Sequence, residues 1–211
     1  MKKTVYLYVF DTMADWEAGY LCAELNSGRY FKKGISPLKV VTVGIKKSPI
    51  TTMGGLKIMP DIDVESCNAE DIAALILSGG GTWMESIHDP ILKKTEKCLQ
   101  EGIIVGAICG ATLGLAESGM LNHKWHTSND LGFLKMTCPN YAGEGYYKHE
   151  SAVTDGNLIT ASGIAPLEFT VHMLKVLEVF SSQTLDSWFN LYNTREGKYF
   201  YHLLDSLEDD N

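Results

Sequence analysis

The sequence predicts a doubly wound α/β fold, in which a mostly parallel sheet carries helices on both of its faces. Short apolar segments rich in β-branched residues, typical of strands buried on both faces, alternate along the chain with longer segments of helical periodicity. Short loops join these segments, which is the pattern of βαβ units. With 211 residues, the chain is long enough for one sizeable domain and too short for two large ones.

The first half of the chain contains segments that predict buried strands, helices and a hairpin. Strands are expected at 4–10, 38–44, 72–81 and 103–109, and helices at 15–26, 89–102 and 110–119. The segment 50–61 has a Gly-Gly break between two short β-like pieces and predicts a hairpin or a bulge. Asp89-Pro90 is a typical helix start and Gly102 a typical helix stop, and together they define the second helix.

The pattern loosens after the third helix. Residues 122–150 are rich in polar, aromatic and glycine residues and predict a functional loop region with short strands. An Asp-Gly turn divides 151–162 into two further strands. A long amphipathic helix is expected over 164–180, because its apolar residues recur with helical spacing.

The C-terminal stretch 184–207 predicts one or two more helices with many aromatic residues. We expect these aromatics to cover the core or a partner subunit: Trp188, Phe189, Tyr192, Tyr199, Phe200 and Tyr201. The chain is therefore expected to have an α/β domain over 1–181 and a helical extension over 182–211 packed on the same domain. Residues 209–211 are expected to form a frayed acidic end.

Composition argues against several classes of partner. A net charge of −8 disfavours nucleic acid and anionic membranes, and no apolar run approaches a membrane span. The basic and apolar start MKKTVYLYVF meets Asp11, Asp15 and Glu17 without a cleavage site, so a first strand is expected rather than a signal peptide. The five cysteines form no C-x-x-C pair, which indicates reduced thiols and a cytoplasmic location.

The segment VGAICGATLGLAESG (105–119) places Cys109 between an expected strand and an expected helix. A nucleophile on such a sharp turn needs small neighbours, which Gly106, Ala107, Gly110 and Ala111 supply. Ligands of open α/β sheets also gather at the carboxyl ends of strands. We expect the helix start to lower the pKa of the thiol and to offer N–H groups to an oxyanion. The alternative is a buried structural cysteine, as expected for the others: Cys22, Cys67, Cys98 and Cys138.

Two more segments are expected at the same edge of the sheet. The glycines of LSGGG (77–81) allow a ligand to approach the backbone, so the N–H groups of Gly80 and Gly110 predict a two-donor oxyanion hole. Asp15-Trp16-Glu17 follows the first strand, although acidic residues suit the first turn of a helix in any case. A carboxyl group beside the Cys109 sulfur implies either a protonated Glu17 that donates to the thiolate or a neutral thiol.

These pieces together resemble the ThiJ/PfpI family of the class I glutamine amidotransferase-like superfamily. The matching segments are DWE (15–17), LILSGGG (75–81), GAICGATLGLAESGML (106–121) and DGNLITASGIAPLEFTVHMLKVL (155–177), so the resemblance spans residues 3–180. It implies a flavodoxin-like sandwich, commonly a homodimer. It further implies that Cys109 is the nucleophile, Glu17 its partner acid, and Gly80 and Gly110 the oxyanion donors.

The sequence departs from that family at the position of the histidine. Some members carry a histidine directly after the cysteine, where this chain has Gly110, and others place one after a Thr-Thr pair downstream. His126, in HKWHTSN, stands earlier than that second pattern expects and is the first choice for a general base, with His149 in reserve. The glutamine-site motif of amidotransferases is missing, so a glutaminase is not expected. No phosphate-binding, dinucleotide or metal motif is present, and no cofactor is expected.

The leading functional hypothesis is a cysteine-dependent hydrolase or lyase, of protease, amidase, glyoxalase or deglycase type, acting on a small carbonyl or amide compound or a peptide. The second hypothesis is a redox sensor in which Cys109 rests as an oxidised acid. The third is a chaperone or interaction protein that uses the aromatic C-terminal helices.

Overall fold

The computed structural model describes residues 4–68 and 72–209. A seven-stranded sheet with the order β5-β2-β1-β6-β7-β9-β8 forms its centre, and every described neighbour pair in it is parallel except β9 with β8. The strands are β1 (Thr4–Tyr8), β2 (Lys39–Gly44), β5 (Ile62–Asp63), β6 (Ile72–Leu77), β7 (Ile104–Ile108), β8 (Ala152–Asp155) and β9 (Leu158–Ala161). The expected doubly wound, mostly parallel sheet is confirmed.

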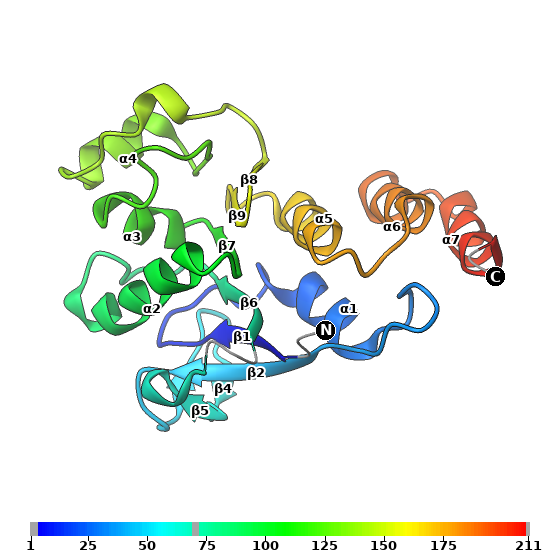
Figure 1. Cartoon of the computed structure of the whole chain (residues 1–211), viewed down its shortest axis with the longest axis horizontal. Coiled ribbons are helices and arrows are strands. Elements are labelled where there is room, and N and C mark those ends of the chain that lie inside the picture. The colour runs from blue at the N-terminus through cyan, green and yellow to red at the C-terminus, as the bar shows by residue number, and fades with distance from the viewer. Residues whose placement is uncertain (1–3, 69–71, 210–211) are drawn as a thin grey trace.

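Helices cover both faces of this sheet (Figure 1). On one face lie α1 (Gly19–Ser27) and α5 (Pro166–Val176), and on the other lie α2 (Asp89–Gln100) and α3 (Ala111–Glu117). Consecutive residues of β6 and β7 are buried, because side chains that point to either face of a central strand meet a helix layer. The apolar runs in the sequence have this origin.

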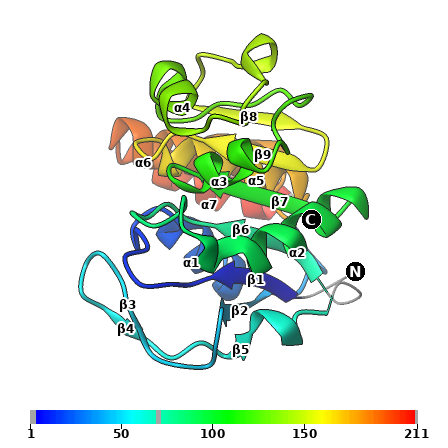
Figure 2. The same ribbon diagram turned by 90° about the vertical axis from the view of Figure 1, so that its left-hand side faces the viewer.

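Two turns predicted from glycine are present as expected. The short strands β3 (Ile50–Thr51) and β4 (Lys57–Ile58) form an antiparallel hairpin that projects from the side of the molecule (Figure 2). Gly55 in its turn has φ +82°, a backbone that L-residues rarely adopt. Gly156, with φ +60°, likewise joins β8 to β9.

The expectation of short strands within 122–150 is wrong. The described segment contains the helix α4 (Leu131–Thr137) and the 3-10 turn η3 (Glu144–Tyr146), with one isolated bridge between His126 and Tyr147. Asp130 starts the helix, since its side chain accepts a hydrogen bond from the N–H of Phe133. Seven residues give too few turns for a clear helical period, and the polar surroundings concealed this one.

The C-terminal stretch folds as two helices, α6 (Ser182–Thr194) and α7 (Lys198–Asp209), which lie outside α5 (Figure 1). Trp188 of α6 is fully buried, whereas Phe200 and Tyr201 of α7 are exposed, so the aromatics of this stretch differ in role. The domain boundary at 181/182 stays a prediction, and the expected acidic end beyond Asp209 lies outside the described residues.

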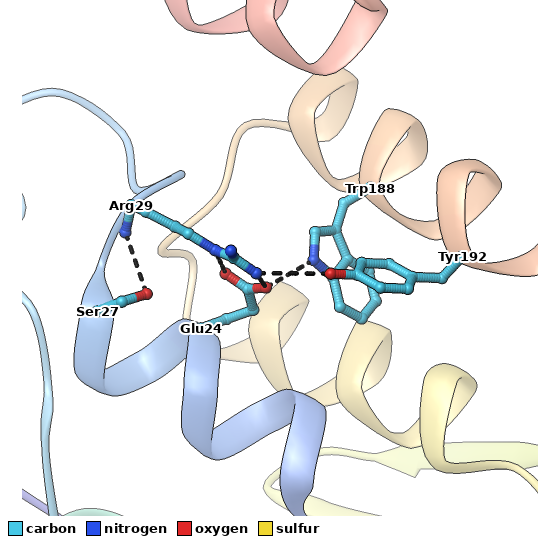
Figure 3. A network of polar contacts seen from close by, with 5 residues as sticks. All are labelled: Glu24, Ser27, Arg29, Trp188 and Tyr192. Carbon is cyan, nitrogen blue, oxygen red and sulfur yellow. Dashed lines mark hydrogen bonds and ion pairs between the residues drawn. The ribbon is translucent and has the colours of Figure 1, made fainter. Parts of the chain in front are cut away.

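A buried glutamate attaches α6 to α1 (Figure 3). Glu24 of α1 is only 1% exposed, and its carboxylate forms an ion pair with Arg29. The indole Nε1–H of Trp188 donates to Glu24 Oε1 at 3.0 Å, and Arg29 also reaches the hydroxyl of Tyr192. Both carboxylate oxygens therefore have partners, one of them on the C-terminal helices. Within the described residues, no helix combines the length and apolar character needed to cross a membrane.

Candidate active site

Cys109 lies directly after β7, in a backbone conformation that non-glycine residues seldom adopt. Its φ is +58°, and its N–H donates to the carbonyl of Ala161 at 2.9 Å. Gly110 follows because a Cβ there would lie 2.7 Å from the carbonyl oxygen of Gly80. Gly106 serves a different purpose, since a Cβ there would meet Met173 of α5. A strained, non-glycine residue at the carboxyl end of a central strand indicates a functional turn.

Glu17 is buried beside this cysteine, in the turn that precedes α1. Its Oε2 accepts a hydrogen bond from the N–H of Gly79 at 2.5 Å. Its Oε1 makes no hydrogen bond of ordinary geometry among the described residues. A Cβ placed on Gly79 would lie 2.9 Å from both Glu17 Oε1 and Cys109 Sγ, so the free carboxyl oxygen and the sulfur lie on the same side of this glycine.

Burial disfavours the charged form of both ionisable groups. Burial raises the pKa of Glu17 to about 7, against the lowering effects of the Gly79 N–H and the thiol of Cys109. Burial also raises the pKa of Cys109, with a further rise from the Glu17 charge, although Asn129 and the Gly110 N–H lower it. The N–H of Gly110 at the start of α3 lowers the thiol pKa, as expected, but desolvation of the sulfur outweighs this effect and the pKa is raised overall. Burial therefore disfavours the charged form of both groups, and the two groups compete for the proton when the pair loses one.

The two glycines expected to hold an oxyanion come from adjacent strands and meet in space. A Cβ on Gly110 would lie 3.1 Å from the backbone nitrogen of Gly80. The Gly110 N–H contributes to lowering the pKa of Cys109, as expected of a donor to the sulfur. Within the described residues, the Gly80 N–H has no protein acceptor. Both donors are thus placed close to the nucleophile candidate.

Asn129 is a site residue that sequence reasoning missed. Its Nδ2 donates to Cys109 Sγ at 3.3 Å, and its Oδ1 accepts from the N–H of Gly163 at 2.8 Å. The backbone of Gly163 packs closely against the cysteine, because a Cβ there would lie 2.7 Å from Sγ. A signal was available: the family pattern places a histidine after a Thr-Thr pair, and Asn129 follows the hydroxyl pair Thr127-Ser128.

Neither His126 nor His149 is among the groups that face the Cys109 sulfur. His126 is fully buried, its Nδ1 lies 2.6 Å from the Lys124 carbonyl and its Nε2 lies 2.8 Å from the hydroxyl of Tyr141. The Nδ1 contact requires an N–H there, and in a neutral ring Nε2 then accepts from the Tyr141 hydroxyl. Burial lowers the pKa of His126 accordingly. His149 is exposed and packs its ring against Tyr147.

Cys109 does not line the cavity beside the end of β1. This cavity has a volume of about 480 Å³, and Phe10, Asp11, Lys46 and His88 contribute to its lining. Phe10 separates it from the glycine run, since a Cβ on Gly80 would lie 2.6 Å from the Phe10 ring. Both ring nitrogens of His88 are bonded, to Tyr8 and to Thr82. Within the described residues, no three His, Cys, Asp or Glu side chains are grouped to hold a metal ion.

Comparison with known proteins gives consistent matches over nearly the whole chain. A Bacillus subtilis (strain 168) protein named "Uncharacterized protease YoaZ" is 57% identical over 205 residues, which cover 97% of this chain and 98% of that protein. The Caenorhabditis elegans protein named "Glutathione-independent glyoxalase DJR-1.2" is 25% identical over 148 residues, or 67% of this chain and 74% of that protein.

A crystal structure of a thiJ/pfpI family protein from Bacillus anthracis matches with a TM-score of 0.95 at 56% identity, over 98% of this chain and 97% of that one. The family model described as DJ-1/PfpI matches residues 3–176, the part that contains the sheet and the Cys109 turn. The chain belongs to the DJ-1/PfpI family.

Proposed function

We propose that this protein is a cysteine-dependent enzyme of the DJ-1/PfpI type that acts on a small carbonyl or amide compound through Cys109. The observation that carries the proposal is the position of the Cys109 sulfur, on a strained turn beside a buried carboxyl group that has one oxygen without a partner. The names of two relatives, one a protease and one a glyoxalase, agree with substrates that contain a carbonyl group.

The first chemical step requires the form of the pair that has lost one proton. In the reactive form, Cys109 is the thiolate and Glu17 is the neutral acid. The sulfur forms a bond to the carbonyl carbon, and the π-electron pair moves to the carbonyl oxygen, which the N–H groups of Gly80 and Gly110 receive. Glu17 then gives its proton to that oxygen. An aldehyde yields a hemithioacetal, and an amide yields the corresponding tetrahedral adduct.

Substitution of the cysteine tests this proposal. We expect Cys109→Ser to lose at least about a hundredfold in turnover of α-oxoaldehydes, amides or short peptides, since the serine hydroxyl is a far weaker nucleophile here. Cys22→Ser is the matched control, because Cys22 is a partly exposed free cysteine in α1. Intact-protein mass spectrometry should show a substrate adduct on the wild type and on Cys22→Ser only. A Cys109→Ser protein that is as active as the wild type would refute the proposal.

The unpartnered oxygen of Glu17 favours a second candidate function, a peroxide sensor. A thiolate attacks one oxygen of hydrogen peroxide and gives sulfenic acid with loss of hydroxide. A second peroxide gives sulfinic acid with loss of water, and the sulfinic acid loses a proton to become sulfinate. A protonated Glu17 Oε1 would donate a hydrogen bond to such a sulfinate oxygen. Mass spectrometry after mild peroxide treatment should find two added oxygens on Cys109 before any other cysteine. Equal oxidation of all five cysteines would exclude this function.

A further inference from the structure

The side chain of Asn129 hydrogen-bonds to the turn after β9 as well as to the Cys109 sulfur. Its Nδ2 is 3.3 Å from Cys109 Sγ, and its Oδ1 accepts from the Gly163 N–H at 2.8 Å and from the Ser162 hydroxyl at 3.4 Å. The side chain therefore connects the cysteine to the turn that follows β9. That turn is the one whose glycine backbone presses against the sulfur.

These contacts fix which end of the amide faces the cysteine. A backbone N–H can only donate, so the atom that meets Gly163 must be the amide oxygen. The amide nitrogen is then left facing Sγ. Since an amide N–H cannot accept a hydrogen bond, its partner is favoured as an acceptor, and a thiolate is a much stronger acceptor than a thiol.

The backbone on either side of Asn129 is held in place residue by residue. The Thr127 N–H donates to the hydroxyl of Thr160 in β9 at 2.9 Å. The Ser128 hydroxyl lies 2.7 Å from the hydroxyl of Thr112, which itself donates to the Cys109 carbonyl at 2.6 Å. The amide of Asn129 is thus presented to the sulfur by a segment tied to both β9 and α3.

We propose that Asn129 stabilises the thiolate form of Cys109 relative to the thiol, through a donor that can neither accept a hydrogen bond nor take up a proton. The inference rests on the proposed function of Cys109 as the nucleophile. The groups that face the sulfur from the packed elements are the Glu17 carboxyl, the Gly110 N–H and the Asn129 amide, and only Glu17 among these is titratable. Glu17 is then the group that exchanges protons with the substrate at this sulfur.

A matched set of variants tests the role of Asn129. Asn129→Asp keeps the oxygen that accepts from Gly163 and replaces only the donor that faces the sulfur. Asn129→Ala removes both groups, and Ser162→Ala removes only the neighbouring hydroxyl. The thiolate absorbance of Cys109 is titrated in each variant, with Cys109→Ala as the blank, and the pH profile of iodoacetamide alkylation is measured in parallel.

Because Asn129 is exposed and water can replace part of its donor strength, we expect the titration midpoint to rise by about 0.5–1 pH unit in Asn129→Ala. The thiolate fraction below the midpoint then falls about three- to tenfold. The rise should be larger in Asn129→Asp, where a second negative charge faces the sulfur, and Ser162→Ala should titrate like the wild type. Equal unfolding midpoints exclude a loss of fold as the cause.

Two results would overturn the inference. If both Asn129 variants titrate like the wild type while the wild type turns substrate over, Asn129 has no influence on the thiolate and the proposed function stands. If Ser162→Ala raises the midpoint as much as Asn129→Asp, the turn after β9 rather than the Asn129 amide determines the pKa of Cys109. Full activity of Cys109→Ser is a separate result, and it would remove the proposed function whatever the titrations show.

Discussion

Two buried glutamates on neighbouring turns of the chain have opposite surroundings. Glu24 has both carboxylate oxygens paired, with Arg29 and with Trp188 of α6 (Figure 3). Glu17 is as deeply buried, yet it has one backbone donor on Oε2 and no hydrogen bond on Oε1 among the described residues. Residue type and burial are the same, so the partners alone distinguish them.

The comparison shows how partners decide what a buried carboxyl group can do. A carboxylate with an ion pair and an indole donor has no oxygen free for a further partner, and it joins two parts of the fold. A half-satisfied carboxyl group keeps its proton to higher pH and has a free oxygen to offer a neighbouring atom. The first arrangement stabilises the molecule, and the second costs stability and leaves one carboxyl oxygen available to the neighbouring sulfur.

The largest expected effect on stability is at the Glu24 contact. Trp188→Ala removes a fully buried indole and the donor to Glu24, and should lower the free energy of unfolding by about 3–5 kcal/mol. Urea unfolding measures this loss. Alkylation of Cys109 in the folded variant should match the wild type, because the two glutamates act independently. Tyr192→Phe is the control, since it removes only a 3.5 Å contact of Arg29. A large change in Cys109 reactivity would contradict the separation of the two regions.

Glu17→Gln is expected to change how stability depends on pH. The folded state raises the pKa of Glu17 from an ordinary value of 4.5 to about 7, so it holds the proton more tightly than the unfolded chain does. Stability is then fully present below the ordinary value and falls as pH rises through the raised one, by up to about 3 kcal/mol. The glutamine has no proton to lose and should abolish this slope.

Urea unfolding at a series of pH values between those limits is the measurement for Glu17→Gln. The matched control is Glu24→Gln, a buried glutamate of the same segment, which should lower stability without abolishing the slope. An unchanged slope in Glu17→Gln would show that another group causes the pH dependence, and the contrast between the two carboxyl groups would fail.

The smallest effect on stability is expected at Glu144, a solvent-exposed carboxylate that can be compared with the two buried ones. Lys135 and Glu144 form an ion pair at 2.7 Å, with both side chains about half exposed. Lys135→Ala should lower the free energy of unfolding by less than about 1 kcal/mol, because water screens the pair, and added salt should reduce the loss further. Thermal unfolding at low and high salt measures both. A loss as large as that of Trp188→Ala would show that burial does not determine how much these carboxylates contribute to stability.

Most of the sheet could be predicted from the sequence because a long buried strand is a local feature, whereas the two-residue strand β5 was not predicted. The residues of β6 are consecutive, apolar and almost fully buried, so composition alone identifies them. The Cys109 turn is local as well, since its small residues adjoin one another. The contact between Glu24 and Trp188 joins residues 164 positions apart, and no short pattern indicates it.

The rest of the site depends on packing. Asn129 reaches Cys109 across 20 positions, and its role required knowing where the polar loop folds back. The direction of the Cys109 pKa depends on how much water the finished fold removes from the sulfur, which helix position alone does not give. His126 was expected in a polar loop, yet the fold buries it under Tyr141 and satisfies both ring nitrogens.

The left-handed backbone at Cys109 has a consequence for anyone who engineers this protein. Glycine suits such a backbone best, and a change from a side chain to glycine there relieves about 1 kcal/mol of strain. Backbone strain alone thus favours glycine over cysteine at this position. A selection for heat-resistant variants alone would therefore enrich glycine at position 109.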